Sequence, residues 1–83
     1  MNKFETLRSA LIGRENEILE YQINIDNYSR AINKINNEYK DNSAMIEFRN
    51  QLQDLLESHK TEQLKSIIIR DVIVEQLNES KAA

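Results

Sequence analysis

The sequence predicts an all-α protein whose two long helices pack as an antiparallel coiled-coil hairpin, in a single domain covering residues 1–83. Three observations support this fold class. An apolar repeat with a helical period fills the first half of the chain, a short turn-like segment follows, and a second helical segment of similar length comes after it. The chain has one glycine, no proline and no cysteine, so it lacks the residues that β-hairpin turns, phosphate loops and disulfide frameworks require.

The first predicted helix covers about residues 3–40. Its apolar residues recur at alternating steps of three and four, which is close to the helical period, so they form one stripe. We expect this stripe to be the intramolecular seam of the hairpin. Its apolar members are Phe4, Leu7, Leu11, Ile18, Tyr21, Ile25, Tyr28, Ile32, Ile35 and Tyr39, and Arg14 is the one charged position within it.

The corner of the hairpin is predicted at about residues 41–43, which read Asp-Asn-Ser. Asparagine tolerates turn geometry, and all three residue types cap helix starts. The alternative is one unbroken rod through Asn42, because no proline forbids a continuous helix. We favour the hairpin, since the two arms are nearly equal and the positions beside the seam lack the oppositely charged pairs of a parallel coiled coil.

The second predicted helix covers about residues 43–78 and is followed by a short frayed tail. Its apolar stripe is less regular, with steps slightly longer on average than those of a coiled coil, and Phe48, Leu52 and Leu56 are its predicted seam residues. If the chain turns at the corner, the numbers of facing residues add to about 84. This rule places Leu52 beside Ile32.

Apolar residues exceed what one hairpin can bury, and the excess lies at the end that carries both termini. We expect it to form an interface with a second copy or with another protein, in a dimer or four-helix bundle, because burial of several aliphatic side chains contributes several kcal/mol. The predicted interface residues are Ile12, Leu19, Ile23, Ile67, Ile68, Ile69, Val72, Ile73 and Val74.

Arg14 is predicted to determine register or specificity, because a guanidinium at a seam position destabilises the seam unless it is paired. Asp71 is one residue from the position that faces it, so an Arg14–Asp71 ion pair is our first interpretation. The alternatives are that Arg14 extends to water along the helix edge, or that it recognises an acidic partner.

The sequence contains no set of residues that predicts catalysis, a metal or a cofactor. His59 and Glu62 share a helix face, but the residues expected near them supply no further ligands, so we expect His59 to be hydrogen-bonded at the helix interface. The three tyrosines lie on the seam, where packing is their expected role. No nucleophile–base set or glycine-rich phosphate loop is present, and we expect the protein not to be an enzyme.

Charge and hydropathy narrow the expected partners. The net charge is -3 and the basic residues are scattered, so nucleic acid is not an expected partner. The chain opens without the apolar run of a secretory signal, and no window is long and apolar enough to span a membrane. We therefore expect a cytoplasmic protein that binds itself and another protein, as an adaptor, small chaperone or inhibitor.

In size and layout the chain is similar to the small helical hairpins of bacterial secretion systems, namely needle subunits and their co-chaperones, and to small phage accessory proteins. This resemblance implies an alternative function as a structural subunit of a larger assembly. The corner departs from the needle subunits, which typically carry prolines there, whereas this chain has Asp41, Asn42 and Ser43. No functional residue is transferred from these families.

Overall fold

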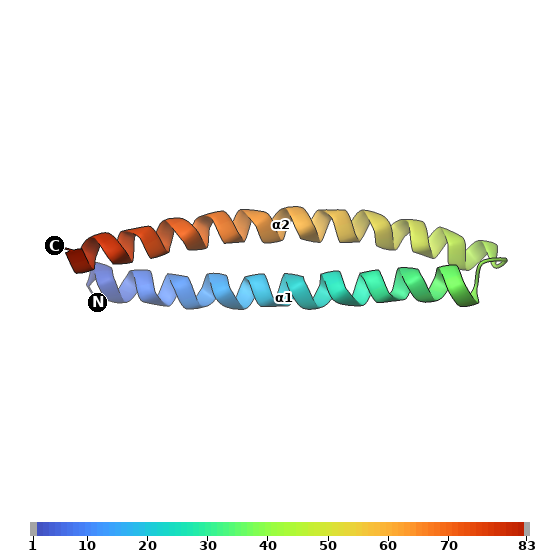
Figure 1. The fold of residues 1–83 in the computed structure, drawn as a ribbon, viewed down its shortest axis with the longest axis horizontal. Coiled ribbons are helices and arrows are strands. Elements are labelled where there is room, and N and C mark those ends of the chain that lie inside the picture. Colours follow the sequence, from blue (N-terminus) through green and yellow to red (C-terminus); the bar gives the residue numbers. More distant parts are fainter. Residues whose placement is uncertain (1, 83) are drawn as a thin grey trace.

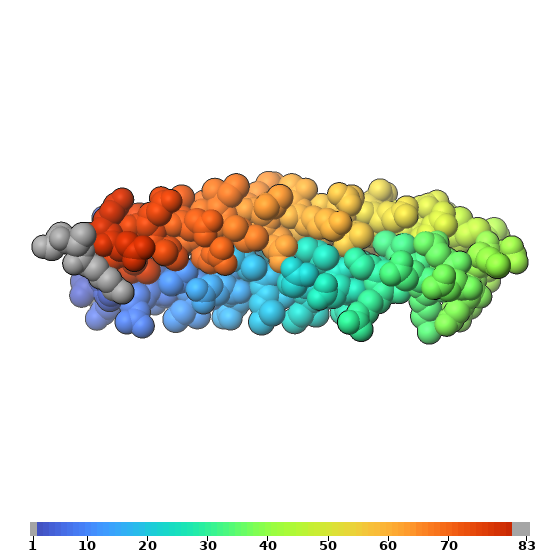
Figure 2. Space-filling model, viewed as in Figure 1, coloured from blue at the N-terminus to red at the C-terminus, as the bar shows by residue number. Residues whose placement is uncertain are grey.

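The protein is a hairpin of two antiparallel α-helices, which confirms the predicted fold class. The structure is a computed structural model that describes residues 2–82, with side chains to residue 80. Helix α1 covers Lys3–Glu38 and helix α2 covers Ser43–Ala82. They lie side by side over their whole length, with both termini at one end and the corner at the other (Figure 1). The molecule measures 62 × 16 × 15 Å and is narrow throughout (Figure 2).

Helix α1 ends slightly earlier than expected, and α2 continues beyond its expected end. Tyr39 has left the helical conformation, with φ −129° and ψ 26°, although its N–H still donates to the Ile35 carbonyl oxygen at 2.9 Å. Its side chain is exposed, so Tyr39 is not the last seam residue that the repeat predicted. A residue in the corner does not follow the helical period, and its side chain need not point to the seam.

An asparagine side chain caps the N-terminus of each helix. Asn2 Oδ1 accepts a hydrogen bond from the Glu5 N–H at 2.8 Å, and Asn42 Oδ1 accepts one from the Met45 N–H at 3.1 Å. Each bond satisfies a backbone donor that has no partner within its own helix. The cap at Asn42 therefore helps to stop one helix and start the next within a few residues.

Replacement of Asn42 by alanine is expected to lower the free energy of unfolding by about 1 kcal/mol, because the cap of α2 is lost. Urea denaturation followed by circular dichroism measures this change. Asn37→Ala is the matched control: Asn37 is exposed within α1, where alanine is the better helix former. Equal destabilisation by the two variants would show that the cap does not stabilise the corner.

The best-packed part of the seam lies towards the corner. Ile32, Ile35 and Leu52 form a buried cluster, which agrees with the facing rule that placed Leu52 beside Ile32. Side chains that are partly buried surround this cluster: Tyr28, Ala31, Met45 and Leu56. Further along the hairpin, Ile25 of α1 and Ile73 and Leu77 of α2 are also buried.

The seam of α2 differs from the one expected. A continuous series of buried and half-buried positions follows strict steps of four and three from the corner, and several of these positions are polar. Phe48 lies beside this seam and is exposed, whereas Ile73 is buried in it and is not available for an intermolecular interface. The observed seam consists of Met45, Arg49, Leu52, Leu56, His59, Gln63, Ser66, Arg70, Ile73 and Leu77.

Candidate protein-interaction surface

Polar contacts determine the register at the middle of the hairpin. Gln63 Nε2 donates to the Ile18 carbonyl oxygen at 3.2 Å and to Gln22 Oε1 at 2.9 Å, so Gln63 lies level with Tyr21. These bonds join α2 to α1 across the seam. A shift in register would leave the Gln63 amide without these partners, at a cost that favours the observed alignment.

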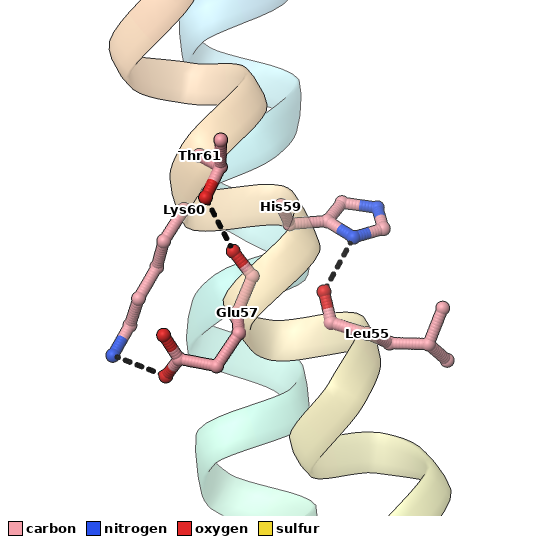
Figure 3. Close-up of polar contacts among 5 residues, drawn as sticks. All are labelled: Leu55, Glu57, His59, Lys60 and Thr61. Carbon is pink, nitrogen blue, oxygen red and sulfur yellow. Dashed lines mark hydrogen bonds and ion pairs between the residues drawn. The ribbon is translucent and has the colours of Figure 1, made fainter.

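His59 belongs to the same polar region. Its ring meets the rings of Tyr21 and Tyr28 edge-on, with centroids 5.6 and 5.1 Å away. Its Nδ1 donates to the Leu55 carbonyl oxygen at 2.8 Å, one turn earlier in α2 (Figure 3). His59 is thus held at the helix interface, and Glu57 beside it contacts Lys60 on the outer surface (Figure 3).

Burial at the interface, followed by the negative charges of Glu17 and Glu62, raises the pKa of the Tyr21 hydroxyl above its ordinary value of 10.0. In a Tyr28→Phe/Tyr39→Phe variant, we expect phenolate absorbance to appear at higher pH in the folded chain than in the urea-unfolded chain. Because the folded-state pKa is the higher one, the stabilisation is complete below the unfolded pKa and is lost as pH rises through the folded pKa. Glu17→Gln should lower the folded midpoint, and an unchanged midpoint would contradict the role of Glu17.

The predicted ion pair between Arg14 and Asp71 is wrong. Arg14 contacts Glu17 on its own helix at 3.4 Å, and Asp71 contacts Arg70 at 3.0 Å. Local partners are within reach without any movement of the helices, which explains why they are preferred. The half-exposed guanidinium of Arg14 fits the alternative in which it extends to water.

Arg14 and Arg70 instead occupy facing seam positions. Gln63 is level with Tyr21, so one heptad further along each helix, in opposite directions, brings Arg70 level with Arg14. Two like charges therefore share one layer of the seam in the half that carries the termini. This layer is a weak point, because like charges repel and neither side chain fills the seam as a leucine would.

Large apolar side chains are exposed in this terminal half. The exposed fraction is 59% for Ile12, Leu19 and Leu64 and 60% for Ile68. Ile23, Ile69, Val72 and Val74 are exposed too, whereas Ile67 is half-buried. Leu55 and Leu64 are exposed apolar residues that the expected interface did not include, although their positions beside the observed α2 seam would have identified them.

One side of the hairpin changes character along its length. Ser29 and Asn33 of α1 line a groove with Gln53 and Glu57 of α2, over the seam residues Ile32 and Leu56, so these four polar residues mark one side of the molecule near the corner. Positions a whole number of heptads away lie on the same side in the terminal half, where charged residues such as Arg8, Glu15 and Asp71 alternate with five apolar ones. We call this set, with its two edge residues, the terminal face: Ile12, Leu19, Ile23, Leu64, Ile67, Ile68 and Val74.

The opposite side of α2 carries a second apolar stripe. Phe48, Leu55 and Ile69 lie at heptad spacings, with Glu62 at the position between Leu55 and Ile69, and Val72 lies one turn after Ile69. All four side chains are exposed. We call them the α2 flank. Helix α2 is therefore apolar on both sides of its seam, a pattern of helices that pack against more than one neighbour.

Comparison with known proteins adds no family to this description. No family model matches the chain, and no curated protein or solved structure does either. Within residues 2–82, no three His, Asp or Glu side chains gather closely enough to hold a metal ion. Neither helix, over its described length, is long and apolar enough to cross a membrane.

Proposed function

We propose that the chain is a non-enzymatic protein–protein interaction module that self-associates through helical packing and acts as an adaptor, small chaperone or inhibitor. The observation that supports this proposal is the exposure of Ile12, Leu19, Leu64 and Ile68, each at least 59% accessible, in one half of a narrow hairpin. Several large apolar side chains exposed together in this way are typical of interaction sites.

The two apolar sides of α2 favour packing against more than one neighbouring helix or protein. The seam of α2 is occupied by α1, while the terminal face and the α2 flank both remain exposed. Bundle helices use such additional stripes for their second and third neighbours. One of these surfaces can therefore serve self-association while the other binds a different protein.

A structural subunit of a larger assembly is the second candidate function. It is favoured by the two apolar surfaces on opposite sides of α2, because different surfaces that meet in a non-closing contact build filaments. Light scattering separates the candidates. The particle mass of a closed oligomer stays constant over a range of concentrations, whereas that of an open assembly keeps rising.

The test of the main proposal is capture of proteins from the native host by an affinity-tagged chain. Leu64→Glu/Ile68→Glu disrupts the terminal face, and Leu55→Glu/Ile69→Glu disrupts the α2 flank. Gln51→Glu/Thr61→Glu is the matched control, with the same charge change at exposed polar positions. We expect a host protein that wild type and control retain and that one of the apolar variants loses. Identical capture by all four chains would overturn the proposal.

A further inference from the structure

We infer that the terminal face binds a second copy of the chain in an antiparallel two-fold dimer, in which the terminal halves overlap and the two corners point in opposite directions. This inference rests on the proposed function, because it names one partner of the module and the surface that binds it. Four lines of evidence support it: the area of the face, its extent along the hairpin, its self-complementarity and its charges.

The area is adequate for a stable dimer. The accessible fractions of the terminal-face side chains correspond to on the order of 600 Å² of apolar surface. A standard interface buries about 800 Å² on each partner, of which roughly two thirds is apolar at the core. The face thus supplies nearly all the apolar area that such an interface needs.

The extent of the face determines how the copies overlap. The same side of the hairpin carries five exposed or half-buried apolar side chains in the terminal half, beside charged residues such as Glu15 and Asp71, whereas near the corner it presents Ser29, Asn33, Gln53 and Glu57. Copies stacked with their corners together would bring these polar groups against one another and remove water from them, which is unfavourable without new partners. An antiparallel overlap buries the apolar side chains of the terminal half and leaves the polar groove near the corner in water.

The face is complementary to itself about one two-fold axis. Such an axis requires that if Ile12 contacts Ile23 of the second copy, Ile23 contacts Ile12 in return. The axis then passes midway between them, close to Ile18. The facing rule puts Ser66 of α2 level with Ile18, and Ser66 lies midway between Leu64 and Ile68. The same axis therefore pairs Leu64 with Ile68 of the second copy and brings the two copies of Ile67 together.

The charges agree with this axis. It places Arg8 level with Asp26 of the second copy, and both residues lie on the side that carries the terminal face. It also places Lys60 between Asp71 and Glu75 of the second copy. Each contact occurs twice in the dimer, so opposite charges meet on both sides of the axis, while Glu15 lies on the same side nearer to it. Such pairs favour this register over others.

The first test is the mass and shape of the purified chain. Light scattering should give twice the 9.8 kDa chain mass, and small-angle scattering should give a maximum dimension of about 80 Å, since the overlap covers only part of each hairpin. Leu64→Glu/Ile68→Glu should halve the mass while its helical content stays unchanged. Leu55→Glu/Ile69→Glu is the matched control and should keep the dimer. A monomeric wild type, or a dimer no longer than the 62 Å hairpin, would overturn the inference.

The second test uses disulfides, because the chain has no cysteine of its own. Ile67→Cys should cross-link to itself beside the axis. Ile12→Cys mixed with Ile23→Cys should give a disulfide-linked pair, whereas each of these exposed variants alone should not. If Ile67→Cys weakens folding, the mixture of Ile12→Cys and Ile23→Cys still tests the arrangement. A dimer that forms no disulfide in this mixture would contradict the inferred axis.

The two proposals can fail separately. A monomeric chain that still captures a host protein would overturn the dimer and leave the proposed function standing. A dimer with the expected cross-links, together with identical capture of host proteins by all variants, would support the dimer and overturn the proposed function. Where both hold, the terminal face is occupied, and capture should depend on Leu55 and Ile69 of the α2 flank.

Discussion

Leu52→Ala is expected to lower the free energy of unfolding by about 3 kcal/mol and to leave much of the protein unfolded at room temperature. Leu52 is 4% exposed and packs with Ile32 and Ile35 in the best-buried cluster of the hairpin. Leucine-to-alanine changes at such positions leave a cavity and typically cost about 2–5 kcal/mol. A chain of this size has little stability in reserve.

Urea denaturation monitored by helical circular dichroism measures this loss. The matched control is Leu55→Ala, which makes the same chemical change in the next turn of α2, where the side chain is 43% exposed. We expect the control to lose less than about 1 kcal/mol. A similar loss in both variants would mean that the cluster around Leu52 does not dominate the stability of the hairpin.

Arg14→Leu and Arg70→Leu are each expected to raise the free energy of unfolding by about 1 kcal/mol, which corresponds to a rise of roughly 4–8 °C in Tm. Each replacement removes one of two like charges that share a seam layer, and puts an aliphatic side chain in its place. Arg14→Leu should leave the particle mass unchanged, because Arg14 contacts Glu17 and makes no ion pair with Asp71.

The double variant separates repulsion from simple hydrophobic gain. If the two arginines repel each other, the first replacement already relieves the repulsion, so the two gains measured singly add to more than the gain of the double variant. Thermal denaturation of all four chains gives this comparison. Arg30→Leu, at an exposed position away from the seam, is the control and should not stabilise the fold. Destabilisation by Arg14→Leu would show that its contact with Glu17 outweighs the repulsion.

Helix α1 and the corner follow closely from the sequence, and the reason is physical. The seam of α1 is almost entirely apolar, so its period identifies the buried face directly. The residue types at Asp41, Asn42 and Ser43 indicate a helix start, and Asn42 does cap α2. With the corner located, the register of the two arms follows from their antiparallel geometry.

The seam of α2 could not be found in the same way, because the apolar pattern there leads away from it. Arg49, Ser66 and Ile73 occupy positions that α1 covers, whereas the apolar pattern points to their neighbours Phe48, Ile67 and Val74. Packing against an apolar partner helix determines the buried face even where the residues of α2 are polar. A strict count of heptads from Met45 would have identified these positions; a search for apolar residues does not.

The candidate surface was only partly predictable for the same reason. The apolar excess in the terminal half is evident from composition, but its division into a terminal face and an α2 flank depends on the true seam. Ile73 was expected at the surface and is buried, while Leu64 was overlooked and is exposed. The ion pair expected for Arg14 is wrong because Arg14 contacts Glu17, one turn along its own helix.

The unequal quality of the seam has a consequence for the order in which the hairpin assembles. Contacts beside the corner join residues close in the chain, so they require the least loop closure, and they include the cluster around Leu52. The terminal half closes the longest loop around the Arg14 layer. We therefore expect folding to begin at the corner and amide protons of the terminal half to exchange first. A second copy that binds the terminal half would then stabilise the part of the hairpin where the two helices separate most readily.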